Sequence, residues 1–234
     1  DLSTFEDIGS FQKIICEKAL MEYLNFGYVP APKTIFKNIF KVPPATSISI
    51  KLDQLKLKNF DTFRDFCEQD SVSLKEFWTL HEAKTLDVGI KYSDVKQTLN
   101  QKLSNAIKLQ QLSDVPLGCF LSGGIDSTLI ASLMSKANKD TKTFTIGFEF
   151  SEYDESIHAE KIAKYLKTDH KTVICSTKET QEIIKSLSKA YTEPFADSSQ
   201  IPTMMISKIA SQDVKVVLTG DCGCLLYTSP SPRD

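Results

Sequence analysis

From Ser93 onward, short apolar runs alternate with amphipathic segments, and this alternation constrains the fold more than any other feature. The apolar runs occupy residues 116–121, 142–148, 170–175 and 214–219. Helical spacing is predicted between them, over about residues 126–136, 155–166, 178–190 and 201–209. Short β-branched runs separated by helices are typical of parallel strands that are covered on both faces. The sequence therefore predicts an α/β fold, a parallel sheet flanked by helices.

A further helix is predicted to precede the first strand. Ser93 can cap its amino terminus. Apolar residues then recur every three or four positions and predict one buried stripe, made of Val95, Leu99, Leu103, Ala106 and Ile107.

The first ninety residues are less regular. Phe11 to Phe26 has helix-like spacing, and the proline-punctuated stretch that follows ends in a strand-like alternation up to Leu52. Residues 53–84 are predicted to form a polar connector that carries scattered aromatic residues.

Composition excludes several functional classes. The net charge of -2 and the pI of about 6.0 argue against nucleic-acid binding. No apolar run approaches the roughly 18 residues that a membrane span requires, so we expect no membrane. No secretion signal is recognised, and the six cysteines are far apart except for Cys222 and Cys224. We therefore expect a protein of the reducing cytoplasm.

The turn after the first predicted strand, within "CFLSGGIDSTLI" at residues 119–130, indicates a ligand site. Ligands of such sheets bind at the carboxyl ends of the strands. Gly123 and Gly124 let the backbone approach a ligand, and the first amides of the following helix favour an anion. Three hydroxyls add hydrogen-bond donors, those of Ser122, Ser127 and Thr128.

Asp126 would repel a phosphate unless a divalent cation lay between them. The turn therefore predicts a magnesium nucleotide. The alternative is an ordinary turn in which Asp126 caps the helix.

The motif "SGGIDS" resembles the pyrophosphate-binding loop of the ATP pyrophosphatases. The wider sequence is similar to the synthetase domain of glutamine-hydrolysing asparagine synthetases, in "SDVPLGCFLSGGIDSTLIASL", "KTFTIGFEFSEYDESIHAEKIAKYL", "EPFADSSQIPTMMISKIA" and "VKVVLTGD". The stretch "LNFGYVPAPKTIFKNIFKVPP" is similar to the end of the glutaminase domain that precedes it in that family. The resemblance runs from Ala19 to Asp221.

The resemblance implies an adenine nucleotide α-hydrolase-like fold and an ATP site. Asp126 is implied as the magnesium ligand. Ile146 and Gly147 would lie against the adenine, although Ile146 could equally be core. The implied nucleotide-binding residues are Leu121, Ser122, Gly123, Gly124, Asp126, Ser127, Ile146, Gly147, Thr219 and Gly220.

Two further acidic stretches are weaker candidates. Residues 152–156 gather three acids before a predicted helix, where capping alone could explain them. Glu193 and Asp197 lie in a proline-broken segment, which could be functional or simply a solvated loop.

The implied reaction adenylates the side-chain carboxylate of aspartate with ATP, and ammonia derived from glutamine then forms the amide. The synthetase half of the enzyme requires no side-chain nucleophile, so no catalytic residue is assigned. The family's glutamine-hydrolysing cysteine follows the start methionine, and nothing here matches it. The resemblance is compatible with a homodimer of the intact enzyme.

After Asp221 the family pattern continues as Gly-Gly-Asp-Glu, whereas this chain has Cys222, Gly223, Cys224 and Leu225. Residues 224–234 correspond to the translation of a sequence that looks like a transposase adaptor. The predicted organisation is the end of a glutaminase domain (1–55), a linker (56–92), the first part of a synthetase domain (93–223) and an adaptor-derived tail (224–234). We expect such a fragment to show little or no turnover.

Two other interpretations stay open from the sequence. One is a relative that adenylates another carboxylate, such as a β-lactam synthetase or a peptide-cyclising enzyme. The other is a non-catalytic nucleotide-binding module.

Overall fold

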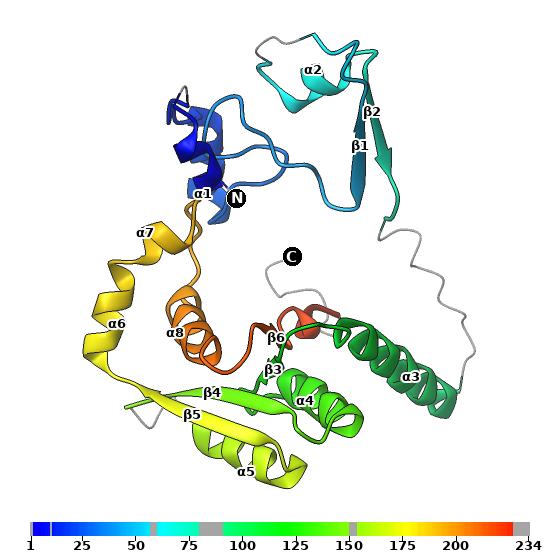
Figure 1. Ribbon diagram of the computed structural model, residues 1–234, viewed down its shortest axis with the longest axis vertical. Coiled ribbons are helices and arrows are strands. Elements are labelled where there is room, and N and C mark those ends of the chain that lie inside the picture. Colours follow the sequence, from blue (N-terminus) through cyan, green and yellow to red (C-terminus); the bar gives the residue numbers. More distant parts are fainter. Residues whose placement is uncertain (1, 10, 57–59, 80–90, 150–153, 227–234) are drawn as a thin grey trace. The chain divides into compact units, whose positions relative to one another are not determined.

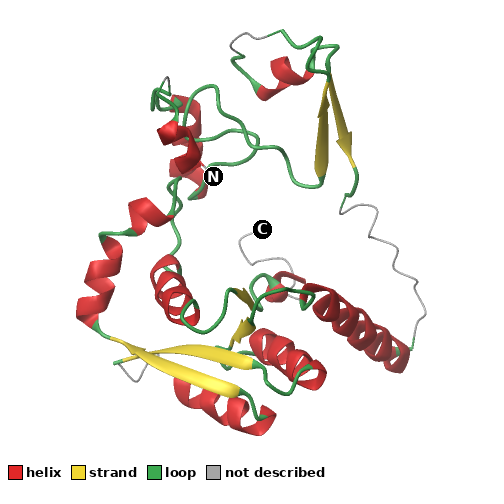
Figure 2. Cartoon of the chain, viewed as in Figure 1, coloured by secondary structure: helices red, strands yellow, loops and turns green. Residues whose placement is uncertain are grey.

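The computed structural model describes residues 2–9, 11–56, 60–79, 91–149 and 154–226 (Figures 1 and 2). Its contacts divide the chain into two compact units. The first comprises Asp1–Val88 and Ser186–Ser198, and the second Gly89–Lys185 and Ser199–Asp234. This division differs from the predicted domain bounds, because residues 186–198 group with the amino-terminal unit.

The second unit contains a four-stranded sheet in the order β5-β4-β3-β6, and every neighbouring pair is parallel. The strands are β3 (Leu117–Phe120), β4 (Lys142–Phe148), β5 (Asp169–Cys175) and β6 (Val216–Leu218). Cys119 of β3 pairs with Thr143 of β4 on one side and with Leu218 of β6 on the other. The predicted α/β fold with a parallel sheet is confirmed.

Helices precede, connect and follow these strands. They are α3 (Tyr92–Gln110), α4 (Ile125–Ala137), α5 (Ser156–Leu166), α6 (Thr177–Ile184) and α8 (Gln200–Ala210), and the short 3-10 helix η3 (Gly223–Leu226) follows β6. No helix in the described ranges is both long and apolar enough to cross a membrane.

Both faces of the sheet are covered, as Figure 1 shows. Helices α3, α4 and α5 cover one face, whose core includes the buried side chains of Cys119 and Leu121. Helix α8 packs on the other face, against Phe144 and the partly buried Phe120. Successive residues of a strand point to opposite faces, which is why Phe120 and its two neighbours belong to different cores.

Two predictions about helix α3 are wrong. Ser93 is not the cap, because the helix begins at Tyr92 with Lys91 at the N-cap position. The stripe is not buried along its length, since Val95 is 45% exposed and Leu99 is 55% exposed. The core reaches only the later stripe positions, where Ile107 is buried.

The predicted helix over residues 178–190 is divided in the structure. Helix α6 ends at Ile184, and the short helix α7 (Leu187–Ala190) belongs to the first unit.

The first unit begins with the 3-10 helix η1 (Leu2–Asp7) and helix α1 (Glu17–Phe26). The helix predicted from Phe11 starts later, because Ile15 forms a β-bridge with Phe36. Strands β1 (Thr46–Ile50) and β2 (Val72–Glu76) form an antiparallel pair. The segment interpreted as a polar connector therefore contributes β2 and also the short helix α2 (Phe63–Cys67), which Thr62 caps.

A polar cluster in the second unit surrounds His170. His170 is half-buried in β5, with Nδ1 2.8 Å from Thr143 Oγ1 and Nε2 3.2 Å from Thr172 Oγ1. Burial lowers the pKa of His170 below its ordinary 6.5, although the charge of Glu160 opposes this shift.

As the pH falls below about 6.5, the unfolded chain therefore binds a proton at His170 before the folded chain does. We expect the free energy of unfolding in urea, followed by circular dichroism, to decrease between pH 7 and pH 5.5. His170→Gln should reduce this decrease, whereas His158→Gln at an exposed site should not. An unchanged pH dependence in His170→Gln would contradict the prediction.

Candidate nucleotide-binding site

The loop between β3 and α4 is held in shape by its own serines. Ser122 Oγ lies 3.0 Å from Ser127 Oγ, and the Ser122 amide donates to Ser127 Oγ at 3.2 Å. Ser127 Oγ in turn donates to the Gly124 carbonyl at 3.2 Å. These bonds fold the loop back onto the first turn of α4, so that the loop and the helix terminus form one rigid feature.

Gly124 occupies the N-cap position of α4 and has no side chain with which to cap this terminus. The first intrahelical bond runs from the Thr128 amide to the Gly124 carbonyl. The helix amides before Thr128 therefore have no partner within the helix. Asp126 is the second residue of α4 and does not occupy the N-cap position, which disfavours the alternative in which it caps the helix.

Gly123 requires glycine for two reasons. Its φ of +86° lies in the left-handed region. A Cβ atom there would lie 3.2 Å from the Ala159 amide nitrogen and equally close to His158 Cβ of α5. The absent side chain thus lets the loop pack directly against a neighbouring helix.

The segment after β6 approaches the same loop backbone to backbone. A Cβ atom on Gly220 would lie 2.7 Å from the Ser127 nitrogen and 2.8 Å from the Asp126 carbonyl carbon. Between these segments lies a groove of about 310 Å³, lined by Phe120, Ser122, Gly124, Ile125, Asp126, Ser127, Thr219, Gly220, Asp221, Cys222 and Cys224. This groove combines helix amides, hydroxyls and carboxylates.

A second cavity of about 210 Å³ shares Phe120 and Ser122 with the groove. Its lining is mainly apolar and comprises Phe120, Leu121, Ser122, Thr145, Ile146, Phe148, Glu155 and Ile206. A polar groove and an apolar cavity thus adjoin at the carboxyl ends of β3 and β4, where parallel α/β sheets bind their ligands.

Comparison with known proteins assigns this unit to a family. A family model described as asparagine synthase matches residues 98–226, which is more than half of the chain. The chain belongs to the asparagine synthase family.

Curated relatives extend the match into the first unit. A putative glutamine-hydrolysing asparagine synthetase 2 of Methanocaldococcus jannaschii is 32% identical over 211 residues, which are 89% of this chain and 37% of the relative. Glutamine-hydrolysing asparagine synthetase 1 of Bacillus subtilis is 27% identical over 88% of this chain and 30% of its own length. The chain thus spans about a third of the length of these relatives.

Among solved structures, an NMN synthetase from Francisella tularensis gives a TM-score of 0.42 at 20% sequence identity. The match covers 56% of each chain.

Most of the nucleotide-binding residues predicted for this member of the asparagine synthase family meet at the site. Eight of them line the groove or the cavity, namely Leu121, Ser122, Gly124, Asp126, Ser127, Ile146, Thr219 and Gly220. The other two are spacers. Gly123 makes room for α5, and a Cβ on Gly147 would lie 2.9 Å from Asp154 Oδ1 and 3.0 Å from Ser156 Oγ.

The acidic stretch at 152–156 divides into different roles. Asp154 accepts a hydrogen bond from the Ser156 amide at 3.0 Å, and hydrogen bonds from Ser156 lower the pKa of this carboxyl. Asp154 therefore binds the first amide of α5, although Glu155 occupies the N-cap position and makes no side-chain cap bond. Residues 152 and 153 lie outside the described part, whereas Glu155 lines the apolar cavity.

Glu193 and Asp197 belong to the first unit. One oxygen of Glu193 accepts the Ile35 amide at 2.7 Å, and the other lies 2.5 Å from Lys41 Nζ. These bonds, with that of the Ala196 amide to the Gly27 carbonyl, hold residues 193–196 on the amino-terminal segment. The structure thus gives Glu193 a structural role that the solvated-loop alternative did not include.

The cysteine of the central strand is not a nucleophile. Cys119 is fully buried, and burial raises the pKa of its thiol to about 12. The thiol therefore stays protonated at neutral pH.

The carboxylates of the groove fit a magnesium ion only if a bound nucleotide supplies further oxygen ligands. Asp126 and Asp221 both line the groove. Within the described ranges, no three Asp, Glu, His or Cys side chains converge on a point where they could hold a metal ion. One or two carboxylates that share the ion with substrate phosphates are the usual magnesium arrangement beside a nucleotide.

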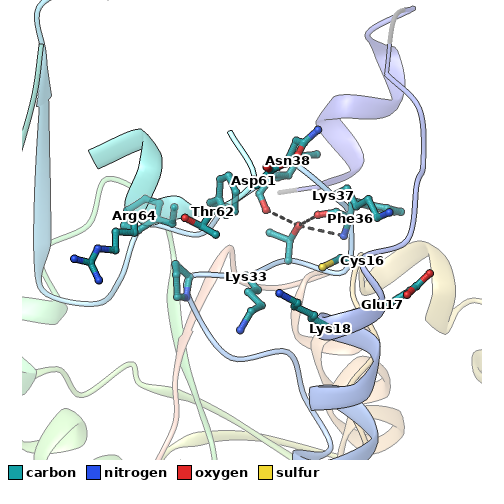
Figure 3. Close-up of a pocket in the computed structure, with 15 residues that line it drawn as sticks. Cys16, Glu17, Lys18, Lys33, Phe36, Lys37, Asn38, Asp61, Thr62 and Arg64 are labelled. Atoms are coloured by element: carbon teal, nitrogen blue, oxygen red, sulfur yellow. Dashed lines mark hydrogen bonds between the residues drawn. The ribbon is translucent and has the colours of Figure 1, made fainter. Parts of the chain in front are cut away.

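A separate cavity of about 560 Å³ lies in the first unit, between residues 16–18, 32–40 and 61–64 (Figure 3). Two of its cations are engaged in ion pairs, Lys33 with Glu22 at 2.6 Å and Arg64 with Glu68 at 2.8 Å. Figure 3 shows Lys33 and Arg64 pointing in different directions. These charges therefore do not converge as the polar groups of the groove do.

The geometry of Gly123 and Gly124 predicts that substitution by alanine destabilises the fold more at Gly123 than at Gly124. Gly123→Ala should lower the free energy of unfolding by roughly 1–2 kcal/mol, because alanine is strained at positive φ. Gly124→Ala is the matched control, since its φ is -70° and its Cβ would meet only Ser122 Oγ, at 3.3 Å. Equal losses for the two variants in urea unfolding would show that the loop conformation is not as described.

Proposed function

We propose that this chain is the nucleotide-binding part of a glutamine-hydrolysing asparagine synthetase. The observation that carries the proposal is the groove between the β3–α4 loop and the segment after β6, with its apolar extension. The polar groove suits the phosphates of a nucleotide, and the adjoining apolar cavity suits its base. The names of the relatives supply the reaction, and the groove supplies a place for the ATP that such a synthetase consumes.

In this proposal, the triphosphate occupies the polar groove. The first-turn amides of α4 face the pyrophosphate that will leave, and the positive end of the helix dipole favours its charge. Asp126 would hold a magnesium ion, which supplies charge neutralisation to the phosphates when it is bound. Thr219 and Gly220 would lie beside the ribose and the α-phosphate, and Ile146 beside the adenine.

The chemistry proceeds in two steps. A side-chain carboxylate oxygen of aspartate attacks the α-phosphorus of ATP, the bond to the bridging oxygen breaks, and pyrophosphate leaves. Ammonia then attacks the acyl carbon of the adenylate, and AMP leaves as asparagine forms. The described site contributes positioning and charge stabilisation, which can supply much of the rate of such a transfer.

The remaining assignments rest on the sequence. We assign residues 1–55 to the end of a glutaminase domain, 56–92 to a linker and 93–223 to the synthetase domain. The ammonia would come from glutamine hydrolysed in a part of the protein that this chain does not include. We further propose a cytoplasmic enzyme, homodimeric when intact.

Binding of ATP tests the proposal directly. Titration calorimetry with magnesium present should detect binding of ATP to this chain. Gly220→Ala should abolish or strongly weaken it, because the added methyl would push the segment after β6 away from Ser127. Gly9→Ala is the control, since a Cβ there meets nothing within 4 Å.

Chelation of magnesium with EDTA should weaken ATP binding by the wild-type chain. Failure of ATP to bind the folded wild-type chain would refute the proposed function. So would Gly220→Ala if it remained folded and bound ATP as tightly as the wild type.

The carboxyl terminus needs a genetic test. We propose that residues 224–234 are adaptor-derived and do not belong to the synthetase, although Cys224 lines the groove. Amplification of the source gene across the codon for Asp221 should reveal a reading frame that continues into Gly-Gly-Asp-Glu. A genomic sequence that encodes the tail and then a stop codon would contradict this assignment.

A further inference from the structure

We propose that His170 is a positioning residue of the nucleotide site. Held with its proton on Nε2, it fixes helix α5 beneath the β3–α4 loop through Thr172 and Glu160. The inference deepens the proposed function and rests on it. These three residues all belong to the described part, and none of them lines the groove or the cavity beside it.

The β3–α4 loop rests on α5. The space that a side chain on Gly123 would need is taken by the Ala159 amide nitrogen and by His158 Cβ, each 3.2 Å from the position of the missing Cβ. Ala159 itself is completely buried. A shift of α5 would therefore move or unsupport the loop that we assign to the phosphates.

The surface of the sheet under α5 is polar. Helix α5 packs on β4 and β5, and its buried inner residues include the small Ala159 and Ala163. On β4, Thr143 and Thr145 face α5, because Phe144 between them belongs to the core on the α8 face. Alanine and threonine bury less apolar area than larger side chains would, so hydrogen bonds supply more of what fixes the position of α5.

One chain of hydrogen bonds joins α5 to both strands. The Thr172 hydroxyl of β5 donates to Glu160 Oε1 of α5 at 2.9 Å and lies 3.2 Å from His170 Nε2. His170 Nδ1 lies 2.8 Å from Thr143 Oγ1 of β4, which in turn lies 2.8 Å from Thr168 Oγ1. The chain thus runs from the surface of α5 through the imidazole to a buried hydroxyl.

The carboxylate at one end sets the direction of these bonds. Because a carboxylate only accepts, Thr172 spends its single hydrogen on Glu160 and can only accept from His170. Nε2 must then carry the proton, and Nδ1 accepts from Thr143. Burial lowers the pKa of His170, which agrees with a neutral ring. The imidazole is therefore a bridge that donates toward α5 and accepts from β4.

Removal of the bridging hydroxyl tests the inference. Thr172→Val keeps the shape of the side chain, and it should bind ATP about three- to tenfold more weakly than the wild type, since a hydrogen bond contributes roughly that factor. Affinity is measured by titration calorimetry with magnesium, at a temperature where circular dichroism shows both proteins folded. Thr203→Val makes the same change at an exposed position of α8 and should leave the affinity unchanged.

Two substitutions of His170 separate the roles of its nitrogens. In His170→Gln the amide nitrogen can replace Nε2 and donate to Thr172, so ATP affinity should stay within about twofold of the wild type. In His170→Asn the amide oxygen can replace Nδ1, but no group remains to donate to Thr172, so the affinity should fall as in Thr172→Val. The double variant should lose no more than either single variant, because both interrupt one chain.

The tautomer can be tested in the wild type without any variant. Nitrogen chemical shifts of the His170 ring at neutral pH should show a protonated Nε2 and an unprotonated Nδ1. A proton on Nδ1 instead would overturn the inference, because Thr172 would then have no donor to accept from.

The other outcomes are equally decisive. Folded Thr172→Val that binds ATP as tightly as the wild type refutes the inference. Equal losses in His170→Gln and His170→Asn also refute it, since they would show only a general structural role of the ring. In each case the wild type still binds ATP and the proposed function stands, whereas absence of ATP binding by the wild type removes the proposed function and this inference together.

Discussion

Strand β3 pairs in parallel with β4 on one side and with β6 on the other, and the site depends on this pairing. In a parallel sheet all strands end at the same edge, so the segments after β3 and β6 emerge side by side. Gly220 then approaches the first turn of α4 so closely that no side chain would fit between them. This backbone contact forms a groove from two segments that lie about a hundred residues apart in the sequence.

The two cores of the sheet keep these segments in place. Cys119 and Leu121 anchor the end of β3 under α4 and α5, while Phe120 points to the α8 face and lines both the groove and the cavity. The strand that supports the phosphate loop therefore also forms part of the apolar cavity. The Thr145 hydroxyl joins β4 to the Leu121 carbonyl at the start of the loop.

Local patterns were sufficient for part of the fold and of the site. The strand at residues 142–148 was predicted with its observed bounds, because a continuous β-branched run is decided by neighbouring residues. Helix α4 was likewise predicted to within a residue at each end.

Other features could not be predicted from neighbouring residues alone. Glu193 looked like a loop residue because its partner Lys41 lies far away in the sequence, and the exposure of Val95 and Leu99 depends on which part of α3 meets the core.

The sequence by itself determined the order of strands and helices, the glycine loop with its hydroxyls, and, through the resemblance, the family that comparison then established. These properties reside in contiguous residues, whose spacing and side-chain chemistry can be recognised without a fold. The tertiary structure alone decided that Phe120, Phe148, Glu155 and Ile206 share a cavity beside that loop. They come from four different segments, and only the pairing of β3 with β4 and the packing of helices on the two faces of the sheet bring their side chains together.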